Sequence, residues 1–131
     1  MDEVLAYLKA NKTYYLATMH DGRPEVRPFG TAVKFEGKLY FQTGKVKDVY
    51  KQIIACPQVA LCTSAPDGTW LRISATAVED TRFETSKAVL DEYPELGDRY
   101  QPGDGNCVEF YLKDAVATFS SFTEEPRTVR F

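Results

Sequence analysis

Cysteine and histidine are scarce in this sequence, and the few that occur follow no metal-binding pattern. The chain has three cysteines and one histidine among 131 residues. No two cysteines form a Cys-x-x-Cys pair, so the sequence predicts neither a zinc site nor a disulfide framework. A histidine-dependent nucleophile would have to use His20, which lies beside the turn Asp21-Gly22. We interpret His20 as a surface residue, and no catalytic residue is predicted.

Long apolar runs and an excess of positive charge are also missing. No uncharged run approaches the roughly 20 residues that a membrane-spanning helix needs. The net charge is −3, whereas nucleic-acid-binding domains usually carry a basic surface. The first residues, MDEVLAYLKANK, lack the pattern of a secretory signal. We therefore expect a cytoplasmic protein that binds neither membranes nor nucleic acid.

The residues that are present predict one α+β domain over residues 1–131. Hydrophobic residues make up 44% of the chain, enough for a core. Alternating patterns and tight turns predict six mainly antiparallel strands that close into a small barrel flanked by helices. The expected strands are 14–19, 25–35, 38–43, 58–64, 69–79 and 107–120, the expected helices are 2–10, 45–55 and 83–90, and the tail 123–131 is expected to be loose.

The stretch YFQTGKVKDVYKQI, residues 40–53, places Lys45 and Lys47 in the first turn of an expected helix. A helix N-terminus has free N–H groups and partial positive charge, so cations are disfavoured there. A bound phosphate would reverse the local sign, with Thr43 adding a hydroxyl and Gly44 a close backbone approach. The alternative is that both lysines point into water. The spacing matches neither a Walker A loop nor a dinucleotide-binding fingerprint.

A second cation precedes a break in the neighbouring strand. Arg27 opens the segment RPFG, residues 27–30, in which proline cannot donate to a sheet ladder and glycine permits close approach. The hairpin would bring Arg27 toward the same anion and the backbone of the segment toward a flat ring. A cross-strand ion pair of Arg27 with Glu25 or Glu36 is the alternative.

The stretches LATMHDGRPEVRPFG, KLYFQTGKVKDVYKQI and GTWLRISATAVE, in this order, resemble the pyridoxamine 5′-phosphate oxidase-like superfamily. The nearest members are its short general-stress and nitroimidazole-resistance-like proteins, and the resemblance covers nearly the whole chain. It implies a mainly antiparallel, six-stranded split β-barrel of Greek-key type flanked by helices. It also implies FMN at the interface of a homodimer. The cofactor-binding residues that it implies are Arg27, Pro28, Phe29, Gly30, Gln42, Thr43, Lys45, Lys47, Trp70 and Arg72.

The resemblance also implies a role for each of these positions. Residues 27–30 would lie along the flavin ring and its ribityl chain, and Gln42 and Thr43 would hydrogen-bond the flavin. Lys45 and Lys47 would hold the phosphate, with Lys47 the more important of the two. No metal is implied.

Trp70 and Arg72 lie on a strand that the partner subunit often supplies in this family. Trp70 would shield the ring, or alternatively pack in the dimer core. Arg72 would meet the phosphate or a substrate.

The C-terminus departs from the family pattern. True pyridoxamine phosphate oxidases carry an arginine-rich motif there, which EEPRTVRF does not match. We therefore expect an FMN-dependent oxidoreductase acting on another small molecule. The alternatives are a deazaflavin-dependent reductase, a non-catalytic flavin-binding or flavin-sensing protein, and a scaffold whose lysines are merely solvated.

Overall fold

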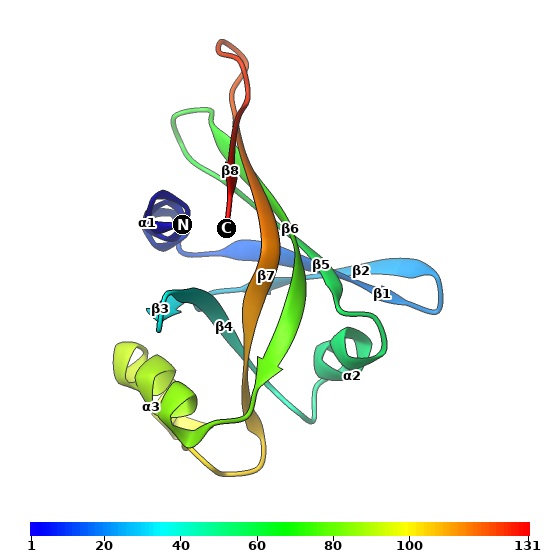
Figure 1. Ribbon diagram of the computed structural model, residues 1–131, viewed down its shortest axis with the longest axis vertical. Helices are drawn as coiled ribbons and strands as arrows, with labels where there is room; N and C mark the ends of the chain where they lie inside the picture. The colour runs from blue at the N-terminus through cyan, green and yellow to red at the C-terminus, as the bar shows by residue number, and fades with distance from the viewer.

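The computed structural model describes residues 1–131 and contains three α-helices, one short 3-10 helix and a single antiparallel sheet (Figure 1). None of the helices is long and apolar enough to cross a membrane. The helices are α1 (Asp2–Asn11), α2 (Asp48–Ala55), α3 (Phe83–Glu92) and η1 (Pro94–Asp98), and the strands are β1 (Tyr14–His20), β2 (Arg23–Phe29), β3 (Val33–Phe35), β4 (Lys38–Gly44), β5 (Gln58–Ser64), β6 (Trp70–Asp80), β7 (Cys107–Ser120) and β8 (Arg127–Arg130).

The sheet is an open, coiled barrel with the strand order β2-β1-β5-β6-β7-β4-β3, and β8 pairs with β7. The long strands β6 and β7 run through its centre (Figure 1), and their register shifts between Ser74 and Thr76. Such an irregularity bends a strand and increases its twist. The end strands β2 and β3 do not pair with each other. The predicted α+β class and split-barrel architecture are confirmed, with eight strands instead of six.

One extra strand arises because the expected strand 25–35 is broken in its middle. Residues 30–32 leave the ladder between β2 and β3, and side-chain hydrogen bonds tie this segment to the neighbouring strands. Tyr14 Oη donates to the carbonyl of Thr31 (2.7 Å), and Thr31 Oγ1 accepts from the Gln42 N–H (2.9 Å). Proline and glycine in the segment predicted a bulge or an edge, and the structure shows a full break.

The other extra strand is the C-terminal tail, so the expectation of a loose tail was wrong. β8 pairs with β7 from Arg127 to Arg130, and Phe131 exchanges two backbone hydrogen bonds with Ala115. Arg127 also forms an ion pair with Glu3 of α1. The two chain ends consequently lie close together (Figure 1).

The expected start of α2 was also wrong. The helix begins at Asp48, and Lys47 is its N-cap in an extended conformation. Lys45 lies in the preceding turn, in which the Lys47 N–H donates to the Gly44 carbonyl (3.1 Å). The first helical residue is therefore an acid, as the helix dipole favours.

The buried face of α2 is narrower than its periodicity predicted. Val49 and Ile53 are buried, whereas Ile54 is 55% exposed. Val46 is 76% exposed because it precedes the helix. The core lies inside the curved sheet and includes Leu16, Phe41, Leu71, Ile73, Phe110 and Ala117.

Candidate functional site

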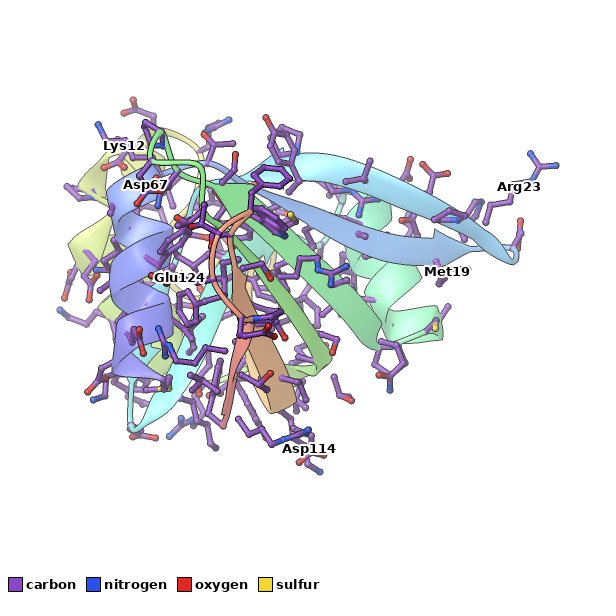
Figure 2. The ribbon with its side chains drawn as sticks, turned by 90° about the horizontal axis from the view of Figure 1, so that it is seen from above. Lys12, Met19, Arg23, Asp67, Asp114 and Glu124 are labelled. Atoms are coloured by element: carbon purple, nitrogen blue, oxygen red, sulfur yellow. The ribbon has the colours of Figure 1, made fainter.

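Two open pockets meet at Lys47, which lines both. The strand-break pocket, about 330 Å³, lies between the β2–β3 break and the corner that joins α3 to η1. The hairpin pocket, about 1050 Å³, lies between the β1–β2 hairpin and α2. Figure 2 shows this hairpin projecting from the sheet, with Arg23 near its end. The strand wall of the strand-break pocket consists of Pro28, Phe29, Gly30, Thr31, Gln42 and Thr43, five of which the sequence predicted as cofactor-binding residues.

Thr43 carries the one buried side-chain polar atom without a hydrogen-bond partner. Its residue is 2% exposed, and Oγ1 contacts no donor or acceptor. A buried hydroxyl without a partner is destabilising, and such groups in native proteins usually have one. The Thr43 hydroxyl therefore fits a ligand that fills the strand-break pocket and supplies the missing hydrogen bond.

The side-chain amide nitrogen of Gln42 already forms hydrogen bonds within the protein. Nε2 donates to the Thr43 carbonyl (2.9 Å) and points at Cys107 Sγ (3.6 Å). The side-chain oxygen has no such partner, so Gln42 offers a ligand an acceptor.

The opposite wall of the strand-break pocket comes from the α3–η1 corner. Tyr93 Oη accepts from the Ala32 N–H (3.1 Å) and donates to the Ala32 carbonyl (3.3 Å). Tyr100 is buried against Gly44, where an added Cβ would lie 2.9 Å from the tyrosine oxygen. We expected Gly44 to bring the backbone close to a ligand, but here it makes room for Tyr100.

Sequence reasoning missed this second wall altogether. It consists of Tyr93, Glu95, Leu96, Arg99 and Tyr100. The segment is rich in proline, glycine and aspartate, and its composition indicates only a loop or a short helix. The usable signal was the spacing of Tyr93, Leu96 and Tyr100 at i, i+3 and i+7, which is typical of a buried helical face.

Arg27 lies in the hairpin pocket and is bound by neutral groups. Its guanidinium donates to Thr18 Oγ1 (2.7 Å), to Gln52 Oε1 (2.8 Å) and to the carbonyl of Leu16 (3.2 Å). Burial lowers the pKa of Arg27, and Glu25 partly offsets this effect, but an arginine remains charged at any physiological pH. The pocket therefore contains a fixed positive charge.

The alternative ion pairs of Arg27 are not formed. No salt bridge joins it to Glu25 or Glu36, and Glu36 binds Arg82 instead (2.8 Å). Lys47 and Lys51 line the hairpin pocket together with Arg27, and both lysines are exposed. These cations suit an anion at the start of α2.

Lys45 is separate from these cations. Its ammonium group lies 3.8 Å from Glu79 Oε2, and it lines a different small cavity of about 210 Å³. The structure thus brings together Arg27 and Lys47 but not Lys45.

Trp70 and Arg72 lie on β6 and contribute to neither pocket of their own chain. The Trp70 ring packs against Phe122 at 5.0 Å. Arg72 lies on the outward face of the sheet, in an apolar depression that also contains Tyr15, Val26 and Cys62. Their predicted role in a partner's site remains a prediction.

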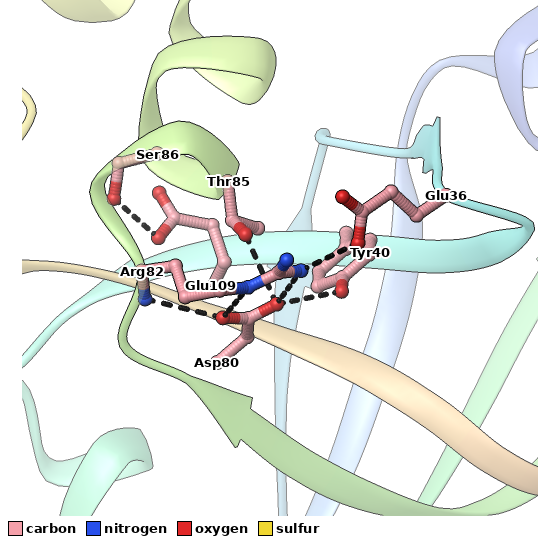
Figure 3. A network of polar contacts seen from close by, with 7 residues as sticks. All are labelled: Glu36, Tyr40, Asp80, Arg82, Thr85, Ser86 and Glu109. Carbon is pink, nitrogen blue, oxygen red and sulfur yellow. Dashed lines mark hydrogen bonds and ion pairs between the residues drawn. The ribbon is translucent and has the colours of Figure 1, made fainter.

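A polar network holds α3, and with it the second wall, against the sheet (Figure 3). Asp80 Oδ2 accepts from Arg82 (2.9 Å), from Tyr40 Oη (2.7 Å) and from Thr85 Oγ1 (3.0 Å). The Arg82 guanidinium, despite the opposing effect of burial, holds the pKa of Asp80 well below its usual range. Arg82 also binds Glu36 in the β3–β4 turn, so the network links this turn with β4, β6 and α3.

Glu109 is the second acid beneath α3 and is 1% exposed. Ser86 Oγ donates to its Oε2 (2.7 Å) and Cys107 Sγ to its Oε1 (3.1 Å). Burial raises the pKa of Glu109, because no cation compensates its charge. Burial and the contact with Glu109 also raise the pKa of Cys107 to about 12, so this cysteine is an unreactive thiol.

No group of three or more His, Cys, Asp or Glu side chains is arranged to hold a metal ion. The two pockets instead offer cations, hydroxyls, an amide oxygen and aromatic rings. These groups fit a flat molecule with an anionic end.

A family model described as Pyridoxamine 5'-phosphate oxidase matches residues 1–101, and the chain belongs to this family. The resemblance inferred from the sequence is thereby confirmed. A solved NimC/NimA family protein from Clostridium acetobutylicum is 33% identical, with a TM-score of 0.96 over 100% of this chain and 92% of that one. No curated protein matches the sequence.

Two more distant structures show the same fold. A pyridoxamine 5'-phosphate oxidase-related, FMN-binding protein from Nostoc punctiforme is 16% identical, with a TM-score of 0.64 over 98% of this chain and 95% of that one. An F420 reductase is 23% identical, with a TM-score of 0.62 over 88% and 94%. The fold is therefore one that flavin-binding proteins use.

Proposed function

We propose that this protein binds FMN across the strand-break and hairpin pockets and is a flavin-dependent oxidoreductase for a small molecule. The observation that carries the proposal is the unpartnered Thr43 hydroxyl in a pocket that continues, past Lys47, into one containing Arg27. FMN combines a flat hydrogen-bonding ring with a phosphate. The strand-break pocket offers hydrogen-bonding groups for the ring, and the hairpin pocket offers positive charge for the phosphate. The description of a structural neighbour as FMN-binding supports this choice.

The residues divide the work of binding between the two ends of the cofactor. Phe29 and Gly30 give the ring a flat wall, and Thr43 Oγ1 and the Gln42 amide oxygen give it hydrogen-bond partners. Arg27 and Lys47 give the phosphate positive charge, and charge-assisted hydrogen bonds are the stronger kind.

FMN, when bound, supplies the electron and hydride transfer, while the protein binds, orients and tunes it. The strand-break pocket contains no histidine or cysteine, and His20 and Cys56 line the hairpin pocket. We assign the chain's residues the tasks of holding the ring and shaping access to it, and we assign no acid–base residue.

We further propose a homodimer that places FMN near the subunit interface. The outward face of β1, β2, β5 and β6 exposes Tyr15 (51%) and Val26 (67%) around the single cation Arg72. Contiguous exposed apolar surface of this kind marks interaction sites. A second copy seated there would bring its own Arg72 and Trp70 toward the pockets, which is the role that the family resemblance implies for them.

The test is the spectrum and ligand content of the purified protein. We expect a yellow protein with a flavin absorption spectrum that releases FMN on denaturation, and whose bound flavin is reduced by NADH or NADPH. A colourless protein that takes up no added FMN would overturn the proposal. Tight flavin binding without turnover would indicate a flavin-sensing protein instead.

A deazaflavin is the second candidate cofactor, because one structural neighbour is an F420 reductase. Competition titrations of the apoprotein with FMN and with F420 decide between them. Stronger binding of F420 would replace FMN in the proposal and leave the site unchanged.

A further inference from the structure

The α3–η1 wall of the strand-break pocket is a fixed surface. Tyr93 anchors one end through its two hydrogen bonds to Ala32. Tyr100 anchors the other end, 6% exposed and packed against Gly44. A ring seated against the strand wall would turn its free face toward this surface, so groups on the α3–η1 wall are placed to meet a substrate.

This wall carries one acidic and one basic side chain that do not form an ion pair. Glu95 and Arg99 are four residues apart, both are exposed and both line the pocket. No salt bridge within 4.0 Å joins them to each other or to any other residue, and the Arg99 guanidinium has no hydrogen-bond partner. Arg82 and Arg127 are bound by carboxylates. Arg23, Arg72 and Arg130 form no salt bridge either, but of the unpaired arginines it is Arg99 that lines the strand-break pocket. Arg99 is therefore free to bind an anionic ligand.

The surroundings of Arg99 define the kind of anion. A guanidinium binds a carboxylate through two parallel hydrogen bonds. Glu95 beside it opposes a dianion such as a phosphate monoester more strongly than a monoanion. Tyr93 and Leu96, on the same wall as Arg99, favour an apolar, flat body.

We propose that the substrate site of this protein takes planar aromatic carboxylates, with Arg99 binding the carboxylate and the α3–η1 wall covering the ring. The inference rests on the proposed FMN site and adds the substrate class. It assigns specificity to residues that lie outside the predicted cofactor set.

The experiment measures benzoate binding to the FMN-loaded, oxidised protein through the change in the visible absorption of the flavin. Benzyl alcohol is the neutral counterpart of the same shape. We expect the wild-type protein to bind benzoate more tightly than benzyl alcohol. In Arg99→Gln the benzoate Kd rises about tenfold or more, while benzyl alcohol binding is unchanged.

Two variants separate charge from packing. Arg99→Lys keeps the charge but loses the fork geometry, so it should recover part of the benzoate affinity. Arg23→Gln makes the same chemical change near the end of the β1–β2 hairpin (Figure 2), outside both pockets, and should leave benzoate binding as in the wild type.

The outcomes distinguish this inference from the proposed function. A wild-type protein that takes up no FMN overturns both. FMN binding with equal benzoate affinity in the wild type and Arg99→Gln overturns only the inference. A tenfold loss of FMN affinity in Arg99→Gln would make Arg99 a cofactor ligand and would also overturn it.

Discussion

Individual side chains decide where an anion and a flat ring can bind. Arg27, Lys47 and Thr43 are brought to one continuous site, whereas Lys45 turns away to Glu79. Two lysines that are equivalent in the sequence therefore have different roles in the structure, and this difference supplies a matched control.

Lys47→Ala should weaken FMN binding with little loss of stability, because Lys47 is exposed and its ammonium group forms no hydrogen bond or ion pair within the chain. Loss of one charge-assisted contact costs about 1.5–3 kcal/mol, which corresponds to roughly one to two decades in Kd. Quenching of FMN fluorescence measures the affinity. Lys45→Ala removes the same charge two residues away and should bind FMN as the wild type does. Equal losses in both variants would place the phosphate elsewhere.

Thr43→Val should make the apoprotein more stable and should weaken its binding of FMN. The apoprotein loses an unpartnered buried hydroxyl, so we expect its free energy of unfolding to rise by about 1 kcal/mol. FMN binding loses one hydrogen bond and should weaken by about 1 kcal/mol, roughly fivefold. Urea unfolding of the apoprotein and fluorescence titration measure the two quantities. A destabilised apoprotein would show that the hydroxyl has a partner in solution.

At the scale of elements, the site depends on how α3 and η1 are attached to the sheet. Asp80 and Glu109 lie beneath α3 and bind Thr85 and Ser86 of its first turns. The helix ends at Glu92, and its C-cap residue Tyr93 hydrogen-bonds Ala32 in the β2–β3 break. The wall of the pocket is thus held at both ends of α3.

Glu109→Gln should remove a pH dependence of stability. Burial raises the pKa of Glu109 in the folded state above its ordinary value of 4.5, so the folded protein binds this proton more tightly than the unfolded chain. Its contribution to stability is then greatest below the ordinary pKa and is lost as pH rises through the folded pKa. Glutamine stays neutral, so the stability of the variant relative to the wild type should increase with pH.

Urea unfolding at intervals from pH 4 to 8 measures this difference. Changes in hydrogen bonding to Ser86 or Cys107 would shift the two curves by a constant amount. A difference in the free energy of unfolding that stays constant with pH would therefore contradict the raised pKa.

At the scale of the whole molecule, the open sheet leaves one apolar face uncovered. Val26 and Tyr15 lie on this face next to Arg72, while the opposite face is filled by the core. In the proposed dimer a second copy covers the exposed face and brings its β6 to the flavin site.

Val26→Lys tests the dimer and the site together. The added ammonium group would lie near Arg72 at the interface, and a buried charge beside a like charge costs more than about 3 kcal/mol, so the dimer should weaken at least a hundredfold. Sedimentation measures the association, and FMN affinity should fall in parallel, although Val26 also borders the hairpin pocket, where an added positive charge by itself favours the phosphate. Ile54→Lys, on the exposed side of α2, is the control and should remain dimeric. A monomeric wild-type protein, or a dimeric Val26→Lys, would contradict the proposed interface.

The sequence by itself determined the α+β class and most strand positions, and its family resemblance indicated five of the six residues of the strand wall, Thr31 being the one it missed. Period-2 alternation, Asp-Gly and Glu-Gly turns and the RPFG break are local signals, because each depends on neighbouring residues along the chain. Lys47 and Arg27 were identified as anion-binding candidates for the same reason.

Only the tertiary structure decided which of these candidates share a site and what faces them. Long-range contacts turn Lys45 to Glu79, pair β8 with β7 and place Tyr100, which follows η1, against Gly44. Sequence periodicity carries no information on such contacts, because they depend on how distant segments pack. The position of Glu95 and Arg99 on the wall of the strand-break pocket, on which the substrate inference rests, is therefore a property of the tertiary structure.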